Sequence, residues 1–374
     1  MLHVQRPPLF LPTVIRITMS DIFPQNPKLF TLTNASGMEV TIMDWGATIH
    51  SIKVPVAGGS KREMLIGPAR PEDYHRQNCY MGATIGRYAN RIDKGTFTAA
   101  GKTFTVGGGK DVVLHGGEVG FDKCRFVVES STSSTVVLKH HSPDGDEGFP
   151  GNFDLTVSYS LSDDGALRMD YLGTCDHECP ACITNHSYFN LNGHQSSVLG
   201  HVAQFNSEEI LVIDSRAIPT GEVYRSTART DRTDNFNFTS PKKLADSPAD
   251  FEGDENMKYT NGYDHAFLIR DGGNASVPCA TITGEKIDGT QVKLEVFTDY
   301  PAIQFYSGNA INQGTPEIAI ARDTGKPYGP WEGFALEPEY YPDAPHLEAF
   351  RALNPPVTPE QPLKRFITYK FTAI

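Results

Sequence analysis

The sequence is poor in cysteine and in basic residues, and it contains no long apolar run. Its 6 cysteines in 374 residues are scattered along the chain, which excludes a small disulfide-stapled fold and favours a reducing, cytoplasmic compartment. The 33 Lys and Arg against 45 Asp and Glu give a formal net charge of -12, which disfavours a phosphate backbone or an anionic membrane surface as partner. No segment approaches the roughly 18 apolar residues of a membrane span. We therefore expect a protein that binds neither nucleic acid nor membrane.

Long helical patterns are also nearly absent, and the dominant hydrophobic period is two. Apolar and polar residues alternate over residues 155–161, 292–296 and 367–371, as in half-buried strands. Turn signals separate these runs, supplied by 34 Gly and 26 Pro. We find no internal repeat and no shift in composition that marks a second domain. The sequence predicts an all-β fold, a large single-domain antiparallel β-sandwich.

The N-terminal segment lacks this alternation. Residues 1–24 include Pro7, Pro8 and Pro12 and show no small-residue cleavage pattern of a signal peptide, so we expect a flexible leader, with the β-sandwich domain at 25–374. Met19 could be the natural start. The competing interpretation is that residues 9–17 (LFLPTVIRI) pack as an edge strand.

Three cysteines and a histidine crowd into residues 175–182, CDHECPAC. If the preceding residues form a strand that continues to position 179, Cys175, His177 and Cys179 share one face, and Pro180 redirects Cys182. No second cysteine pair completes a zinc tetrahedron, and the Cys179-Pro180-Ala181-Cys182 run lacks the strand-to-helix context of redox motifs. We expect these thiols to be dispensable and the protein to hold no metal.

Most familiar catalytic motifs are missing. There is no GxSxG, no HExxH and no GxGxxG after a strand, and GGGK at 107–110 is expected to be a hairpin turn because no helix follows it. Chemistry by histidine and carboxylate remains. His186 lies in TNHSYFNLNGH, and four other segments combine turn glycines, aromatic and hydrogen-bonding residues: 82–92, 114–123, 262–269 and 334–345. Each of them taken alone has a purely structural interpretation, as a cap, a turn or a solvated face.

Taken together, GRYANRI, LHGG with GFDK, TNHSYFNL, YDHAFL, PAIQFYSGN at 301–309 and ALEPEYYPDAP resemble the aldose 1-epimerases, the galactose mutarotases, and most of all the bacterial branch. The resemblance runs from about residue 32 to the C-terminus, in matching order and spacing. It implies the galactose mutarotase-like supersandwich fold and an isomerase that interconverts the α and β anomers of free aldohexoses such as galactose and glucose.

The family's roles transfer to single positions. The resemblance implies that His186 is the general acid and Glu337 the general base, with Glu339 a nearby carboxylate where many relatives carry an amide. It implies that sugar hydroxyls are bound by Asn90, Arg91, His115, Asp264 and Gln304.

Anomer interconversion needs one proton removed from the C1 hydroxyl and one delivered to the ring oxygen, so one base and one acid suffice without cofactor, metal or covalent intermediate. From reference pKa values of about 4.3 and 6.5 we expect Glu337 to be ionised and His186 to be held protonated by nearby carboxylates, with Asp264 the candidate for that role.

Two alternatives stay open on the sequence. One is a hexose 6-phosphate 1-epimerase, which would need a basic phosphate clamp. The other is a non-catalytic sugar-binding β-sandwich module, since a fold does not guarantee an activity. In each case the partner is a monosaccharide, and the protein is expected to be a monomer or homodimer.

Overall fold

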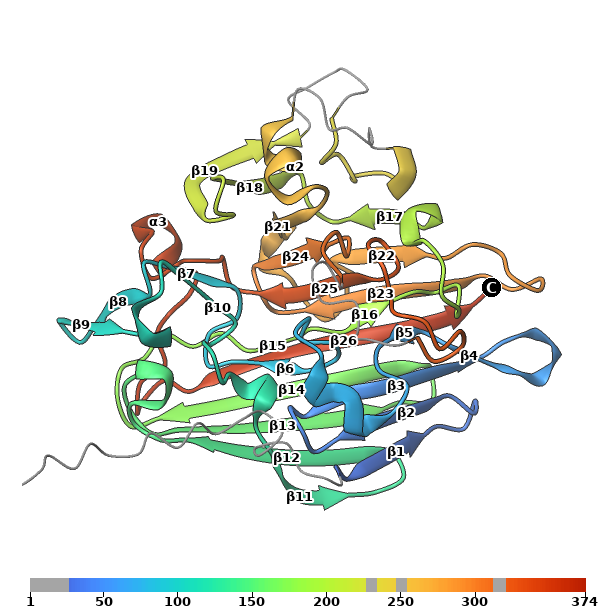
Figure 1. Ribbon diagram of the computed structural model, residues 1–374, viewed down its shortest axis with the longest axis horizontal. Helices are drawn as coiled ribbons and strands as arrows, with labels where there is room; N and C mark the ends of the chain where they lie inside the picture. Colours follow the sequence, from blue (N-terminus) through green and yellow to red (C-terminus); the bar gives the residue numbers. More distant parts are fainter. Residues whose placement is uncertain (1–26, 227–233, 247–253, 312–320) are drawn as a thin grey trace, which may run out of the picture.

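A computed structural model describes residues 27–226, 234–246, 254–311 and 321–374, which are drawn in colour in Figure 1. The predicted leader, residues 1–24, lies outside the described residues, so it stays a prediction. Two short α-helices are present in the described part, α2 (Glu255–Thr260) and α3 (Glu348–Arg351). Neither is long and apolar enough to cross a membrane.

Antiparallel strands make up most of the regular secondary structure of the described chain, and most of them form two large sheets. The nine-stranded sheet has the order β11 (Val127–Ser131), β12 (Thr135–Ser142), β13 (Phe153–Leu161), β14 (Ala166–Cys175), β26 (Leu363–Ala373), β23 (Val292–Thr298), β22 (Ala280–Thr283), β17 (Val202–Phe205) and β20 (Lys242–Lys243). The seven-stranded sheet has the order β19 (Pro219–Arg225), β18 (Glu209–Ile213), β21 (Asp264–Leu268), β24 (Ala302–Tyr306), β25 (Phe334–Glu339), β16 (Tyr188–Phe189) and β5 (Leu65–Ile66).

Smaller sheets flank these two. A four-stranded sheet contains β1 (Leu29–Thr33), β2 (Glu39–Met43), β3 (Thr48–Pro55) and β4 (Lys61–Glu63), in that order. Three two-stranded pairs are β6 (Thr84–Ile85) with β15 (Thr184–Asn185), β7 (Arg91–Asp93) with β10 (Val112–Leu114), and β8 (Thr96–Ala99) with β9 (Lys102–Thr105). In Figure 1, β11 to β14 cross the lower part of the view, while β18, β19 and α2 gather at the opposite end.

The all-β antiparallel architecture predicted from the sequence is confirmed. All three alternating segments are strands: 155–161 lies in β13, 292–296 in β23 and 367–371 in β26, and in each the apolar positions are buried. A common core joins the sheets, because the buried face of β13 and β26 packs in one cluster with β24 and β25. Tyr159, Phe305, Leu336 and Tyr369 are fully buried in this cluster. Burial of these faces against one another accounts for the layered arrangement.

Two local predictions are wrong. Strand β14 ends at Cys175, so His177 does not continue its alternation, because residues 176–178 turn out of the sheet. The GGGK segment is a turn but not a hairpin: β9 before it pairs with β8, and β10 after it pairs with β7. Gly107, Gly108 and Gly109 all have positive φ there, a backbone conformation that glycine adopts without steric cost.

Candidate active site

Strand register places a polar face on the seven-stranded sheet. Gln304 of β24 lies opposite Glu337 of β25, and on its other side opposite Ala266 of β21. Because side chains alternate along a strand, Asp264, Gln304 and Glu337 point to the same face of the sheet. The intervening residues Phe305 and Leu336 point to the opposite face and are fully buried in the core. The alternation thus gives one apolar face for packing and one polar face for chemistry.

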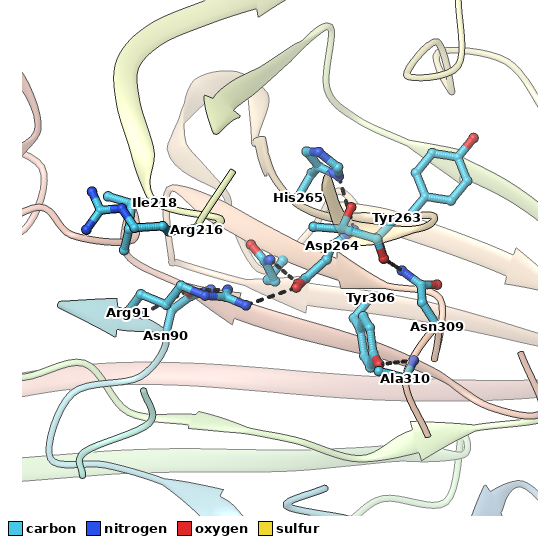
Figure 2. Close-up of polar contacts among 12 residues, drawn as sticks. Asn90, Arg91, Arg216, Ile218, Tyr263, Asp264, His265, Tyr306, Asn309 and Ala310 are labelled. Atoms are coloured by element: carbon cyan, nitrogen blue, oxygen red, sulfur yellow. Dashed lines mark hydrogen bonds and ion pairs between the residues drawn. The ribbon is translucent and has the colours of Figure 1, made fainter. Parts of the chain in front are cut away.

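Asp264 is the centre of a hydrogen-bonded chain on this face. Its Oδ1 accepts from Gln304 Nε2 at 2.7 Å, and its Oδ2 lies 3.2 Å from Arg91 Nη2. Figure 2 shows the side chain of Arg91, from β7, directed at Asp264. Asn90 extends the chain: its Oδ1 accepts from Arg91 Nη1 at 3.3 Å, and its Nδ2 donates to Glu339 Oε1 at 2.7 Å. Five side chains from four strand regions are therefore fixed relative to one another.

Two hydrogen bonds that involve backbone atoms link Asn90 and His115. His115 N donates to Asn90 O at 3.0 Å, and Asn90 N donates to His115 Nδ1 at 3.1 Å. Both residues have positive φ, 63° and 53°, at the ends of the paired strands β7 and β10. Because Nδ1 accepts a hydrogen bond, the proton of the neutral imidazole is on Nε2. His115 is thus a hydrogen-bond donor through Nε2.

His186 lies between β15 and β16 and faces Glu337. Its Nε2 is 3.4 Å from Glu337 Oε1. The backbone of His186 is tied to the neighbouring 82–83 segment by two hydrogen bonds of 2.9 Å each. The rings of Tyr188 and Tyr80 stack against the imidazole at 4.9 and 5.8 Å, with interplanar angles of 29° and 28°. The imidazole is therefore held in place by rings and backbone while its Nε2 stays directed at the carboxylate.

All seven residues assigned from the sequence line one cavity of about 460 Å³. They are Asn90, Arg91, His115, His186, Asp264, Gln304 and Glu337. Three buried polar atoms on this wall have no hydrogen-bond partner among the described residues: His186 Nδ1, Gln304 Oε1 and Glu337 Oε2. Buried polar atoms without partners are rare in folded proteins and here lie where a polyhydroxylated ligand could satisfy them.

Burial sets the charge states of the site. It lowers the pKa of His186 to about 4, against a smaller raising effect from the Asp264 carboxylate. Burial also raises the pKa of Glu337 well above its usual range, with the nearby Glu339 and Asp264 carboxylates adding to the shift. The pKa of Glu339 is raised to about 8, mainly by burial, so at neutral pH it carries a proton and is uncharged, as an amide would be.

The expectation that His186 is held protonated is therefore wrong, and burial also opposes the ionised form expected for Glu337, since reference pKa values take no account of desolvation. Asp264 acts in the expected direction on His186, but burial outweighs it. The lowered pKa of His186 and the raised pKa of Glu337 nevertheless favour a state in which the pair holds one proton. Neutral His186 with protonated Glu337 has the same number of protons as imidazolium His186 with Glu337 carboxylate, and the two states differ only in which residue carries one proton. The pair therefore holds the one base and the one acid that coupled proton transfer needs.

His115, His186 and Glu337 are also candidate ligands for a metal ion, because each offers one potential ligand atom and these three atoms lie within 4.8 Å of one another. The tautomer of His115 argues against a metal ion here. A histidine that binds a metal through Nε2 keeps its proton on Nδ1, whereas His115 Nδ1 accepts from Asn90 N. The trio fits a hydrogen-bonding and proton-transfer site better than a metal site.

The thiols of residues 175–182 lie outside the cavity and do not share one centre. Cys175 contacts Cys179, whose Sγ is 3.8 Å from Arg87 Nη1. Cys182 Sγ instead accepts from Tyr340 N at 3.4 Å. The prediction that Cys175, His177 and Cys179 share one strand face fails because β14 ends at Cys175.

We expect metal removal to leave the protein active. Purified protein should contain no stoichiometric zinc by elemental analysis, and prolonged EDTA treatment should change the turnover rate by less than about twofold, because no step of the proton transfer requires a Lewis acid. Tight one-to-one zinc that is lost on changing Cys175, Cys179 and Cys182 together to serine would contradict this prediction.

Sequence reasoning missed part of the cavity wall. Tyr80, Tyr188 and Tyr306 line the cavity, as does Arg216. Tyr188 follows His186 by two residues, so its position in the same motif was a usable signal for a ring beside the imidazole. Arg216 lies in a turn between β18 and β19, far in sequence from every motif, and only the strand order of the seven-stranded sheet brings it to the cavity.

Comparisons with known proteins agree on one family. The family model described as aldose 1-epimerase matches residues 28–357. The chain is 40% identical to the aldose 1-epimerase of Escherichia coli K12 over 347 residues, which is 92% of this chain and 95% of the relative. It is 35% identical to the galactose mutarotase of Homo sapiens over 324 residues, 86% of each chain.

Solved structures agree with this fold. A crystal structure of an aldose epimerase homologue from C. elegans superposes with a TM-score of 0.80 at 24% identity, covering 93% of this chain and 100% of that one. The galactose 1-epimerase of Lactobacillus acidophilus gives a TM-score of 0.74 at 26% identity, covering 92% of this chain and 93% of that one.

Proposed function

The chain belongs to the aldose 1-epimerase family and is an isomerase that interconverts sugar anomers, and on that premise we propose its substrates and its catalytic residues. The proposed substrates are free, uncharged aldohexoses such as galactose and glucose. The proposed general acid is His186, and the proposed general base is Glu337. The observation that carries the proposal is the pairing of His186 Nε2 with Glu337 Oε1 at 3.4 Å in a cavity walled by hydrogen-bonding groups.

The reaction follows from two proton transfers. Glu337, as carboxylate, takes the proton of the C1 hydroxyl while His186, as imidazolium, gives its proton to the ring oxygen, so the C1 to ring-oxygen bond breaks and an open-chain aldehyde forms. Rotation about the C1–C2 bond exposes the other face of the aldehyde, and the ring closes with the two roles exchanged. The two sugar oxygens are both bonded to C1, so the acid and base must lie close together, as this pair does.

The remaining cavity groups suit the sugar hydroxyls. Arg91 and His115 offer donors, while Asp264 and the unpartnered Oε1 of Gln304 offer acceptors, all on strand or strand-end positions. Tyr188 and Tyr306 provide apolar ring faces next to them. Polar groups that fix orientation together with aromatic faces are the usual composition of a sugar site.

The hexose 6-phosphate alternative is less well supported. Its phosphate would need a cation that is available for pairing. Arg91 and Arg216 are the arginines of the described cavity wall, and each is already paired with carboxylates: Arg91 with Asp264, and Arg216 with Asp93, Asp111 and Asp214. The alternative of a non-catalytic sugar-binding module does not explain why the acid and base face each other.

The substrate proposal is tested by anomer exchange. Freshly dissolved α-galactose and α-glucose are followed by polarimetry with and without the protein, and glucose 6-phosphate is compared by exchange NMR at anomeric equilibrium. We expect strong acceleration with both free sugars and little with the phosphorylated one. Preferential turnover of glucose 6-phosphate would overturn the substrate proposal while leaving the reaction class intact.

The pH dependence of kcat/KM provides a separate prediction, because kcat/KM reports groups of the free enzyme. Below the pKa of His186, about 4, the acid–base pair carries two protons and no base is available. Above it the pair carries one proton, the competent number. We therefore expect the acidic limb of kcat/KM near pH 4 and full activity at pH 6. An acidic limb near the ordinary histidine pKa of about 6.5 would contradict the effect of burial on this site.

A further inference from the structure

Arg216 lies on the wall of the cavity but outside the hydrogen-bonded chain around Asp264. It belongs to the turn that joins β18 and β19, and Asp214 fixes this turn by accepting from Arg216 N at 2.8 Å and from Ile218 N at 3.0 Å. The Arg216 side chain is 38% exposed. Figure 2 shows its guanidinium on the side away from Asp264. The backbone position is thus rigid, while the charged end is reachable from solvent.

Three carboxylates form ion pairs with the guanidinium of Arg216. Nη1 lies 2.7 Å from Asp93 Oδ1 and 3.3 Å from Asp111 Oδ2, and Nη2 lies 3.0 Å from Asp214 Oδ2. One positive charge faces three negative ones, so the group carries a net charge of +1 − 3 = −2. Lys94, which is 73% exposed and 3.8 Å from Asp93, offsets a part of this charge. Arg216 is the member of this group that lines the cavity, and the excess of negative charge surrounds its guanidinium.

The same ion pairs connect elements that carry sugar-binding groups. Asp93 is the last residue of β7, which begins at Arg91, and Asp111 immediately precedes β10, which leads to His115. Arg216 therefore joins the β18–β19 turn to both strands of the β7–β10 pair. An anionic group on a sugar at this part of the wall would have to displace a carboxylate from Arg216 and remain next to the others, which is unfavourable for like charges at short distance.

We propose that Asp93, Asp111 and Asp214 are specificity-determining residues: by occupying Arg216 they make the site selective for uncharged sugars, and freeing Arg216 from them would let the site accept a sugar that carries an anionic group. This inference rests on the proposed function. It assigns selectivity to repulsion by carboxylates that contact Arg216 of the wall, in addition to attraction by the groups that hold the ring. Arg216 is then a latent anion-binding group whose positive charge is more than offset by its neighbours.

The double variant Asp93→Asn with Asp111→Asn tests the proposal. It keeps side-chain shape and leaves Asp214 in place to support the turn. Exchange NMR at anomeric equilibrium would measure kcat/KM for galactose, glucose 6-phosphate and galacturonate, so that phosphate and carboxylate are compared. We expect kcat/KM for one or both anionic sugars, relative to galactose, to rise about tenfold or more, since local charge of the right sign raises substrate capture by such factors. Galactose turnover should stay within about threefold of wild type.

The matched control adds Arg216→Gln to the double variant and should return the ratio to the wild-type value. If the ratio is unchanged in the double variant while galactose turnover is retained, or if the gain survives Arg216→Gln, the proposal is overturned. Should the double variant be insoluble, Asp111→Asn alone, at a side chain 75% exposed, must give a smaller rise in the same ratio. A wild-type protein that fails to accelerate galactose exchange would instead overturn the proposed function itself.

Discussion

Replacing Glu337 by glutamine should lower kcat by about 10² to 10⁴ fold, the usual effect of removing a general base. The introduced amide would keep the shape and the hydrogen-bonding capacity of the side chain but could not accept the C1 hydroxyl proton. KM for galactose should change little, because the hydroxyls are held by other groups of the wall. Initial rates of α-galactose mutarotation by polarimetry measure both quantities.

The matched control is Glu339→Gln, two residues along the same strand. Glu339 is fully buried and binds Asn90, but it does not line the cavity. Because burial holds its pKa at about 8, the carboxyl is already neutral at pH 7, and an amide should replace it with kcat changed by less than about tenfold. If Glu339→Gln loses turnover and Glu337→Gln keeps it, the base has been assigned to the wrong carboxylate.

Stability separates a catalytic defect from a folding defect in Glu337→Gln. The folded-state pKa of Glu337 is raised above its ordinary value, so the folded protein binds more protons than the unfolded chain, and this group makes the free energy of unfolding fall as pH rises above about 4.5. Glutamine does not titrate and removes that penalty. The Tm of Glu337→Gln at pH 8 should therefore equal or exceed that of wild type, as measured by circular dichroism.

Replacing His186 by asparagine should lower kcat by a similar factor, about 10² to 10⁴ fold, because no group remains to protonate the ring oxygen. The acidic limb near pH 4 should disappear from the residual activity, since the group that titrates there is gone. The rings of Tyr80 and Tyr188 would lose their stacking partner, so a modest decrease in Tm is also expected.

A suitable control for His186 lies in the same motif. His194 donates from Nδ1 to Asn192 O at 3.0 Å and lines a different pocket, next to Arg322 and Asp323. His194→Asn should therefore keep kcat within about threefold of wild type. Equal losses in the two variants would indicate that the motif acts through folding and that His186 has no separate role in proton transfer.

The sequence was sufficient to predict three of the long strands and seven residues of the cavity wall. A period of two identifies β13, β23 and β26 without further information, because a half-buried strand must alternate. The family resemblance groups residues as distant as Asn90 and Glu337, and the structure places both of them at one cavity.

The sequence could not predict the charge states or the role of Arg216. The pKa values of His186 and Glu337 depend on burial, which is a property of the packed sheets and has no counterpart in the local sequence. The three carboxylates around Arg216 come from β7, from the residue before β10 and from the turn itself, so their proximity depends on how these elements are arranged. The end of β14 at Cys175 was missed for a similar reason, since nothing in CDHEC marks the end of a strand.

The central claim is that His186 and Glu337 act together as the acid and base of anomer interconversion, and the double variant His186→Asn with Glu337→Gln tests it most directly. The measurement is the first-order rate of optical-rotation change of fresh α-galactose, at equal concentrations of wild-type and variant protein that share the same circular dichroism spectrum. The effects of substituting two groups that act as a unit are not additive. The rate with the double variant should therefore be about as low as with the slower single variant and close to the rate in buffer. A double variant that still interconverts the anomers at near the wild-type rate would contradict the account.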